Sequence, residues 1–184
     1  PGLNLTFEVR EGIVKHSRDL APGECPELDQ YLSEWRPPLE AQLIDLADEI
    51  AYNTADLDDA FSARFFDLET LAGSVPAYGD LYASVCRQFP AASERTRFQE
   101  TLRRLIDCLV SGLIEGTRAA ALLAKVRDVE EVRRLPVRLA RSTDDAAALT
   151  SALKQFLHRH VYDSPDLVEE RRRATVLIAE LFQL

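Results

Sequence analysis

Two carboxylates and a phenol recur at four-residue intervals in one segment of the chain, at Asp48, Tyr52 and Asp56. If the segment is helical, each step of four residues turns about 40° round the axis, so the three side chains share one face. Such a face can bind a divalent cation through a carboxylate and a sugar hydroxyl through the phenol and the second carboxylate. Acidic helix faces are also common as solvated surfaces, and the pattern alone favours that interpretation.

The same spacing recurs near the other end of the chain, at Lys154, His158 and Tyr162. On a helix these side chains again point together and offer a cation, an imidazole and a phenol to a polar ligand. The alternative is a half-buried core tyrosine beside a solvated lysine and histidine, since tyrosine and lysine combine an apolar body with a polar tip. The spacing alone favours this alternative.

The segment that holds Asp48 has the features of a helix from Pro37 to about Phe61. Prolines are tolerated in a first helical turn, and Glu40 suits the positive end of the helix dipole. An apolar stripe runs along the segment through Leu43, Leu46, Ala47, Ile50 and Ala51.

Helices are predicted along most of the remaining chain as well. Glycine and proline are few, strand-like alternation of apolar residues is missing, and apolar residues repeat at threes and fours in the longer segments. We expect helices at about 5–15, 62–71, 77–88, 93–125, 142–161 and from Ser164–Pro165 onward, with a loop at 17–36 that contains one helical turn around 28–35. The sequence therefore predicts an all-α fold.

Composition excludes several classes of protein. The net charge of −9 argues against a protein that coats nucleic acid, although it does not exclude a local basic pocket. Three cysteines without a paired spacing indicate neither a disulfide framework nor a zinc site, which fits the cytoplasm. No apolar run approaches the roughly 20 residues that span a bilayer, so we expect no membrane association.

Three strings around the first candidate face resemble the last motif of the bacterial dGTP triphosphohydrolase family, in the HD-domain superfamily. They are Leu39–Gln42, Leu46–Thr54 and Asp56–Asp59. Gly2–His16 resembles the segment that follows the catalytic histidines of that family. Leu153–Pro165 resembles its closing motif and the matching helix of the eukaryotic sterile-alpha-motif HD triphosphohydrolase.

The resemblance implies a role for each candidate residue. Asp48 corresponds to the fourth ligand of the HD metal site, and Tyr52 and Asp56 to residues that contact the deoxyribose 3'-hydroxyl. Lys154 corresponds to a basic residue that meets phosphate, and His158 to a residue near the phosphates or the sugar. Tyr162 corresponds to the aromatic residue that packs on the deoxyribose where a 2'-hydroxyl would clash.

The resemblance also implies what the chain lacks. Its three histidines are His16, His158 and His160, and none is followed by Asp, so the His-Asp doublet of HD enzymes is missing. For His16 a cation at a helix end is favoured over a metal ligand. Ala55 departs from the family, where a histidine often stands. We therefore expect no catalytic residue within the chain and no activity of the chain alone, because one carboxylate cannot fix a catalytic metal.

As a whole the resemblance covers the chain and implies the C-terminal portion of an HD-domain-like helical assembly without its N-terminal HD helices. Residues 1–184 would form a single helical region, with the last HD motif in 1–61 and a C-terminal helical part in 62–184. The expected parent is a cytoplasmic hydrolase that converts a dNTP to deoxynucleoside and tripolyphosphate with Mg, Mn or a similar divalent metal. It is expected to be a homo-oligomer, with hexamers as the family precedent. The alternative is a nucleotide-binding regulatory or assembly module with a degenerate HD site.

Overall fold

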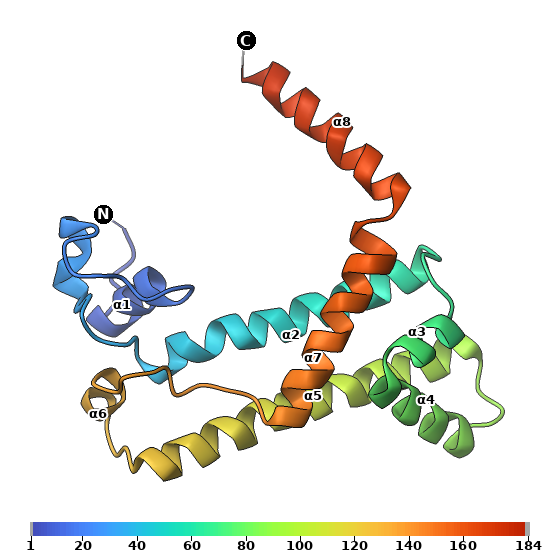
Figure 1. The fold of residues 1–184 in the computed structure, drawn as a ribbon, viewed down its shortest axis with the longest axis horizontal. Coiled ribbons are helices and arrows are strands. Elements are labelled where there is room, and N and C mark those ends of the chain that lie inside the picture. Colours follow the sequence, from blue (N-terminus) through green and yellow to red (C-terminus); the bar gives the residue numbers. More distant parts are fainter. Residues whose placement is uncertain (1, 183–184) are drawn as a thin grey trace. The chain divides into compact units, whose positions relative to one another are not determined.

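The computed structural model describes residues 2–182, apart from the side chain of Asp166, and every regular element in this range is helical (Figure 1). This confirms the predicted all-α class. The elements are α1 (Phe7–Lys15), η1 (Pro26–Tyr31), α2 (Leu39–Ser62), α3 (Leu68–Ser74), α4 (Pro76–Gln88), α5 (Glu94–Ala124), α6 (Val129–Arg133), α7 (Asp144–Leu157), η2 (His158–Tyr162) and α8 (Pro165–Leu181). None of the helices in this range combines the length and hydropathy needed to cross a bilayer.

Most helix boundaries follow the predicted signals. Thr6 caps α1, with the Val9 N–H donating to its hydroxyl at 3.4 Å, and Pro165 opens α8. The helix expected at 62–71 instead begins at Leu68, because Arg64 adopts a positive φ of 63° and Asp67 caps the new start by accepting from the Thr70 N–H at 2.7 Å. The short helix α6 was not predicted.

Two compact units divide the chain. The first comprises Pro1–Ala51 with Cys108–Ala147, and the second comprises Tyr52–Asp107 with Ala148–Leu184. The long helices α2 and α5 each contribute residues to both units.

A buried ion network holds α1 in the first unit. Glu11 accepts from the Lys15 ammonium at 2.8 Å and from Arg133 Nη2 at 2.5 Å. Lys15 also donates to the carbonyl oxygens of Tyr31 and Leu32, at 3.2 and 3.0 Å. Glu11 and Lys15 are fully buried, so each charge depends on these partners for its solvation.

Close backbone packing joins α5 to the segment before α7 in the first unit. A Cβ on Gly116 would lie 2.5 Å from the Arg141 carbonyl oxygen and from the Ser142 carbonyl carbon. The neighbouring Thr117 hydroxyl lies 3.1 Å from the same Arg141 oxygen, to which it donates. Since both contacts involve backbone, only glycine fits at position 116.

Gly116→Ala is therefore expected to destabilise the chain, although alanine is the better helix former. Alanine gains up to about 1 kcal/mol in an open helix, whereas forcing a methyl group into packed backbone costs typically 1–3 kcal/mol. The measurement is the urea midpoint of unfolding. Gly73→Ala in α3 is the control, because a Cβ there meets nothing within 4 Å; an unchanged midpoint for Gly116→Ala would contradict the close approach.

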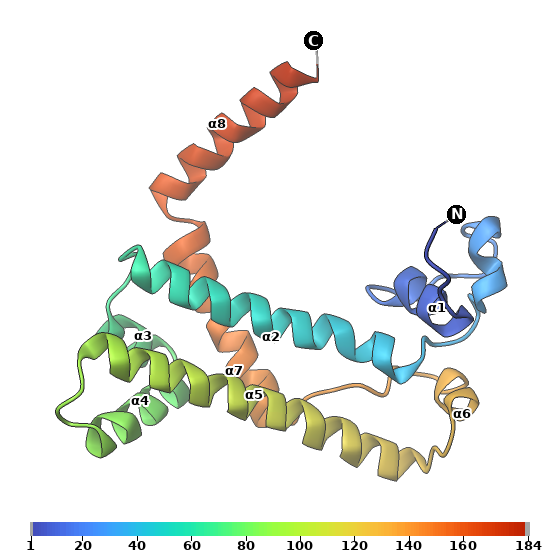
Figure 2. The same ribbon diagram turned by 180° about the vertical axis from the view of Figure 1, so that it is seen from behind.

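Aromatic packing forms the core of the second unit. Phe61 stacks on Phe98 with ring centroids 4.0 Å apart, and Phe66 meets Phe156 edge to face at 4.9 Å. In the same unit α3 and α4 lie side by side (Figure 2). These contacts fix α7 by its apolar face, which determines which of its side chains remain at the surface.

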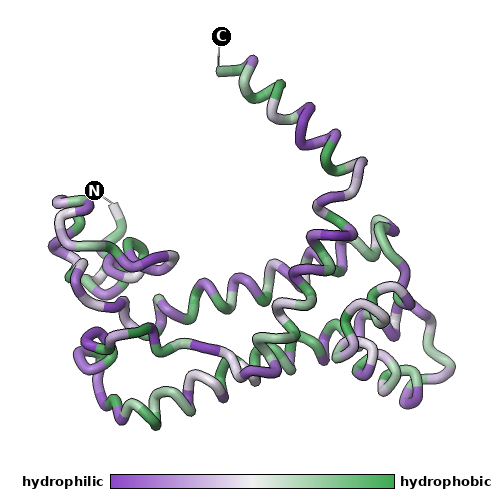
Figure 3. The backbone as a smooth tube through the Cα atoms, in the orientation of Figure 1, coloured by the Kyte–Doolittle hydropathy of each residue, from purple (hydrophilic) through white to green (hydrophobic). Residues whose placement is uncertain are grey.

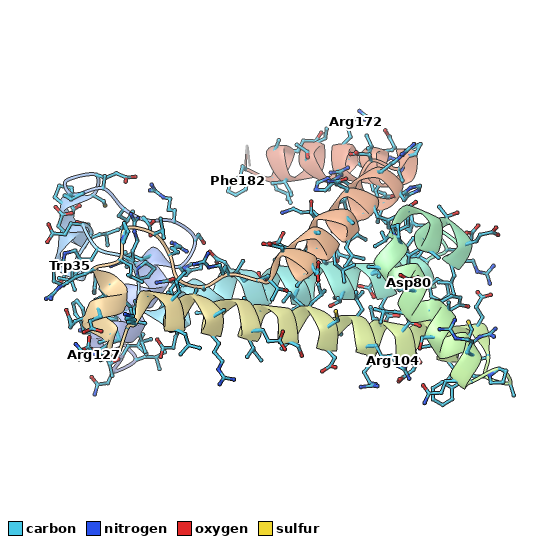
Figure 4. The ribbon with its side chains drawn as sticks, turned by 60° about the horizontal axis from the view of Figure 1, so that its bottom comes forward. Trp35, Asp80, Arg104, Arg127, Arg172 and Phe182 are labelled. Carbon is cyan, nitrogen blue, oxygen red and sulfur yellow. The ribbon has the colours of Figure 1, made fainter. Side chains whose placement is uncertain are left out.

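The last helix, α8, extends away from the other helices of the second unit (Figures 1 and 2). Hydrophobic and hydrophilic residues mix along it, and Phe182 lies at its exposed end (Figures 3 and 4). Within this unit α8 contacts η2, and the Arg171 guanidinium of α8 donates to the Tyr162 carbonyl oxygen of η2.

Candidate functional site

Tyr52 and Asp56 lie on the part of α2 that belongs to the second unit. The core face of this part includes Asn53, Thr54, Leu57 and Ala60, which are buried. Because Tyr52 and Asp56 stand at other angles round the helix, Tyr52 is exposed and Asp56 is half-buried. Asp48 lies on the part of α2 that belongs to the first unit, and it is exposed.

The residues of the second candidate face are carried by α7 and by the wider turn η2 that continues it. Burial of Leu153, Phe156, Leu157 and Val161 directs these side chains into the core. Lys154 and His158 are consequently exposed, and Tyr162 is half-buried at the edge. The predicted regular helix through Val161 is wrong at its end, since η2 is a π-helical turn closed by the Asp163 N–H donating to the His158 carbonyl at 2.9 Å.

Within the second unit the structure brings four of the predicted residues together. The Tyr162 phenol donates a hydrogen bond to Asp56 Oδ2, across 106 positions of sequence. The Tyr162 ring centroid lies 6.4 Å from that of Tyr52 and 5.0 Å from that of His158, the latter edge to face. Lys154 stands on α7 four residues before His158. Two stretches far apart in sequence thus form one cluster.

The electrostatics of this cluster favour a neutral tyrosine. Burial, and then the hydrogen bond to Asp56, raise the pKa of Tyr162 above the ordinary value for a tyrosine. The phenol is therefore protonated at neutral pH and acts as a donor, while Asp56 acts as an acceptor. A donor and an acceptor side by side suit recognition of a hydroxyl group, and they do not make a nucleophile.

Sequence reasoning missed two residues that hold this cluster in place. The His160 ring stacks on Phe156 at 4.5 Å, and Phe156 in turn packs against Phe66 in the core. Arg171 on α8 donates a hydrogen bond to the backbone carbonyl oxygen of Tyr162. No periodic signal marks either residue, because His160 is placed by the wide turn and Arg171 acts on a carbonyl group.

The described residues do not by themselves fit a bound cation. Among residues 2–182, His, Cys, Asp and Glu side chains form no group of three that could hold a metal ion. His16 is the C-cap of α1, and its Nδ1 lies 2.9 Å from the Ile13 carbonyl oxygen, which agrees with the helix-end role predicted for it. Asp48 can therefore contribute at most one ligand to a site that other residues complete.

Known proteins are similar to this chain over its whole length. The phosphohydrolase-associated domain family matches residues 140–184. Proteins named deoxyguanosinetriphosphate triphosphohydrolase-like protein are similar throughout: the one from Ralstonia nicotianae is 38% identical over 100% of this chain and 47% of its own length. Those from Thiobacillus denitrificans and Caulobacter sp. are 35% and 34% identical over 98% and 100% of this chain, and over 48% and 49% of their own lengths.

The chain thus spans about half the length of the curated relatives it matches. The comparisons confirm the resemblance predicted from the sequence strings. The phosphohydrolase-associated domain at 140–184 is consistent with a C-terminal portion of such a protein.

Proposed function

We propose that this chain, similar over its whole length to part of the dGTP triphosphohydrolase-like proteins, is the part of a dNTP triphosphohydrolase that holds the deoxyribose. The reaction would convert dGTP or another dNTP to deoxynucleoside and tripolyphosphate. The observation that carries the proposal is the hydrogen bond from Tyr162 to Asp56, because it joins the two strings whose resemblance implies sugar contacts. Coincidental matches would give no reason for these two side chains to meet.

Each residue has a role in this proposal. Tyr52 and Asp56 bind the 3'-hydroxyl, and the ring of Tyr162 packs on the deoxyribose. Lys154 and His158 face the phosphates, where a cationic donor is favourable. Asp48 supplies one ligand of a divalent cation, Mg, Mn or similar, which would neutralise charge on the phosphate oxygens.

The remaining parts of the proposal concern the protein as a whole. The other metal ligands come from outside this chain, and the chain alone does not hydrolyse nucleotides. The complete enzyme works in the cytoplasm as a homo-oligomer. The apolar residues of α5 are divided between core and surface: Phe98, Leu105, Leu109 and Leu113 are buried, whereas Ile106, Val110 and Ile114 are exposed.

A chimaera provides the test of this function. In it, residues 1–184 replace the matching part of the Ralstonia nicotianae relative, so that the unmatched part of the relative is present. Tripolyphosphate release from each dNTP is measured with Mn or Mg for the chimaera and for the chain alone. Release by the chimaera only is expected; release by the chain alone would show the ligand assignment to be wrong. A folded chimaera that binds nucleotides without releasing tripolyphosphate would favour the regulatory module.

Tyr162→Ala should reduce the preference of the chimaera for dGTP over GTP. Removing the ring opens the space where a 2'-hydroxyl would clash. Steric selection of this kind changes the ratio of kcat/KM between two substrates by about 10–200-fold. The measurement is the ratio of kcat/KM for the two nucleotides. Tyr162→Phe is the matched control, because it keeps the ring and loses only the hydrogen bond to Asp56; an undiminished ratio in Tyr162→Ala would exclude Tyr162 as the selecting residue.

A further inference from the structure

On the helix α1, two apolar side chains are exposed to solvent while two charged ones are buried. Glu11 and Lys15 are fully buried against Arg133 and η1, whereas Val9 and Ile13 are 46% and 60% exposed. Exposing a single apolar side chain is ordinary, but a helix that solvates its apolar stripe while burying an ion network is not. The exposed stripe of α1 is therefore a surface that needs a partner.

This stripe forms one wall of an apolar groove in the first unit. The groove has a volume of about 620 Å³, and its opposite wall consists of Pro38 with Ala41 and Ile44 of α2. At its floor the helices approach closely, since a Cβ on Gly12 would lie 3.3 Å from the Ala41 Cβ. Ile44 is 53% exposed. A groove between two helices, with apolar residues four positions apart on one wall and three apart on the other, has the form that receives a third helix.

The last residue of α2 that lines the groove is Ile44, one helical turn before Asp48. Ile44 precedes Asp48 by four residues, and both side chains are exposed on the same face of the helix. Whatever fills the groove beside Ile44 therefore passes within one helical turn of the carboxylate. Among the described residues no others complete a metal site with Asp48.

We propose that the groove between α1 and α2 receives an apolar helix from the part of the relatives that this chain does not match. The relatives are about twice as long as the matched region, so a polypeptide of comparable size is available to cover the groove. The docking itself does not depend on the proposed function.

The test measures docking without enzymatic activity. Hydrogen–deuterium exchange of α1 and of residues 39–48 is compared between the chain alone and the chimaera defined above. Burial of the groove is expected to slow exchange there at least about tenfold in the chimaera. Ile13→Glu and Ile44→Glu should lower the melting temperature of the chimaera and leave that of the chain alone nearly unchanged. Val137→Glu, at a 64% exposed position outside the groove, is the control and should be neutral in both.

Two results would overturn the proposal. Equal effects of Ile13→Glu on the chain alone and on the chimaera would show that the groove has no partner in the unmatched part. If the chain alone were a dimer by light scattering and Ile13→Glu made it monomeric, the occupant would be a second copy. Protection of the groove in a chimaera that releases no tripolyphosphate would support docking and contradict only the proposed function.

Discussion

Asp48→Ala is expected to abolish dNTP hydrolysis by the chimaera and to weaken its binding of Mn. Loss of groups that merely orient metal ligands typically costs 10–100-fold in metal affinity or activity, so loss of a ligand should cost at least about 100-fold. Because Asp48 is exposed, alanine leaves no buried group unpaired and should not disturb the fold. The measurements are bound Mn per chain and tripolyphosphate release.

Asp45→Ala is the matched control for this prediction. Asp45 lies on the same helix three residues earlier, and its Oδ2 is 3.9 Å from Arg138 Nη1. Its removal should reduce stability slightly and leave Mn binding intact. If Asp48→Ala binds Mn as tightly as the unchanged chimaera does, Asp48 is not a ligand, whatever happens to the activity.

Local signals were sufficient to predict most of the helices. The prolines before α2, the cap at Thr6 and the long apolar periodicity of α5 are features of neighbouring residues, so the sequence displays them directly. Packing was harder to predict. Ala47 and Ala51 belong to the apolar stripe predicted for α2, yet both are exposed, while the polar Gln42 and Asn53 are buried.

The physical reason in these cases is a partner distant in sequence. Gln42 is buried because its side-chain oxygen accepts from the backbone N–H groups of Leu139 and Ala140, at 2.6 and 3.1 Å. Glu11 is buried because Arg133 reaches it from α6, a five-residue helix too short to give a periodic signal. Hydropathy patterns contain no information about such partners.

The candidate site was also predicted only in part, because local spacing indicates helix faces and does not indicate contacts between distant segments. Spacing alone placed Asp48, Tyr52 and Asp56 on one face and Lys154, His158 and Tyr162 on another. It favoured a solvated surface for the first face, and a half-buried core tyrosine beside a solvated lysine and histidine for the second. Only the resemblance predicted that the two faces serve one ligand. The contact between Tyr162 and Asp56, the wide turn η2 and the hydrogen bond from Arg171 appear only in the structure.

Glu11→Gln is expected to destabilise the chain by about 3–5 kcal/mol, the usual cost of removing one partner from a buried ion pair. The substitution keeps the size of the side chain, leaves buried Lys15 without its paired carboxylate, and leaves Arg133 with Glu130 as its remaining partner. The measurement is the free energy of unfolding in urea at pH 7. Glu100→Gln is the control, since Glu100 pairs with Arg103 and Arg104 near the surface and should contribute much less.

The pH dependence of that loss separates a charge effect from a packing effect. Burial lowers the pKa of Lys15, and the hydrogen bond and charge of Glu11 oppose this shift. Without Glu11 the pKa of Lys15 in the folded state should fall further. The ordinary pKa of a lysine, which applies in the unfolded chain, is about 10.4. At pH values just below about 10.4 the unfolded chain therefore binds more protons than the folded chain. Stability then rises with pH in that range, and the deficit of Glu11→Gln should shrink between pH 7 and pH 10. A deficit that stays constant over this range would mean that Glu11 acts through packing and not through its charge.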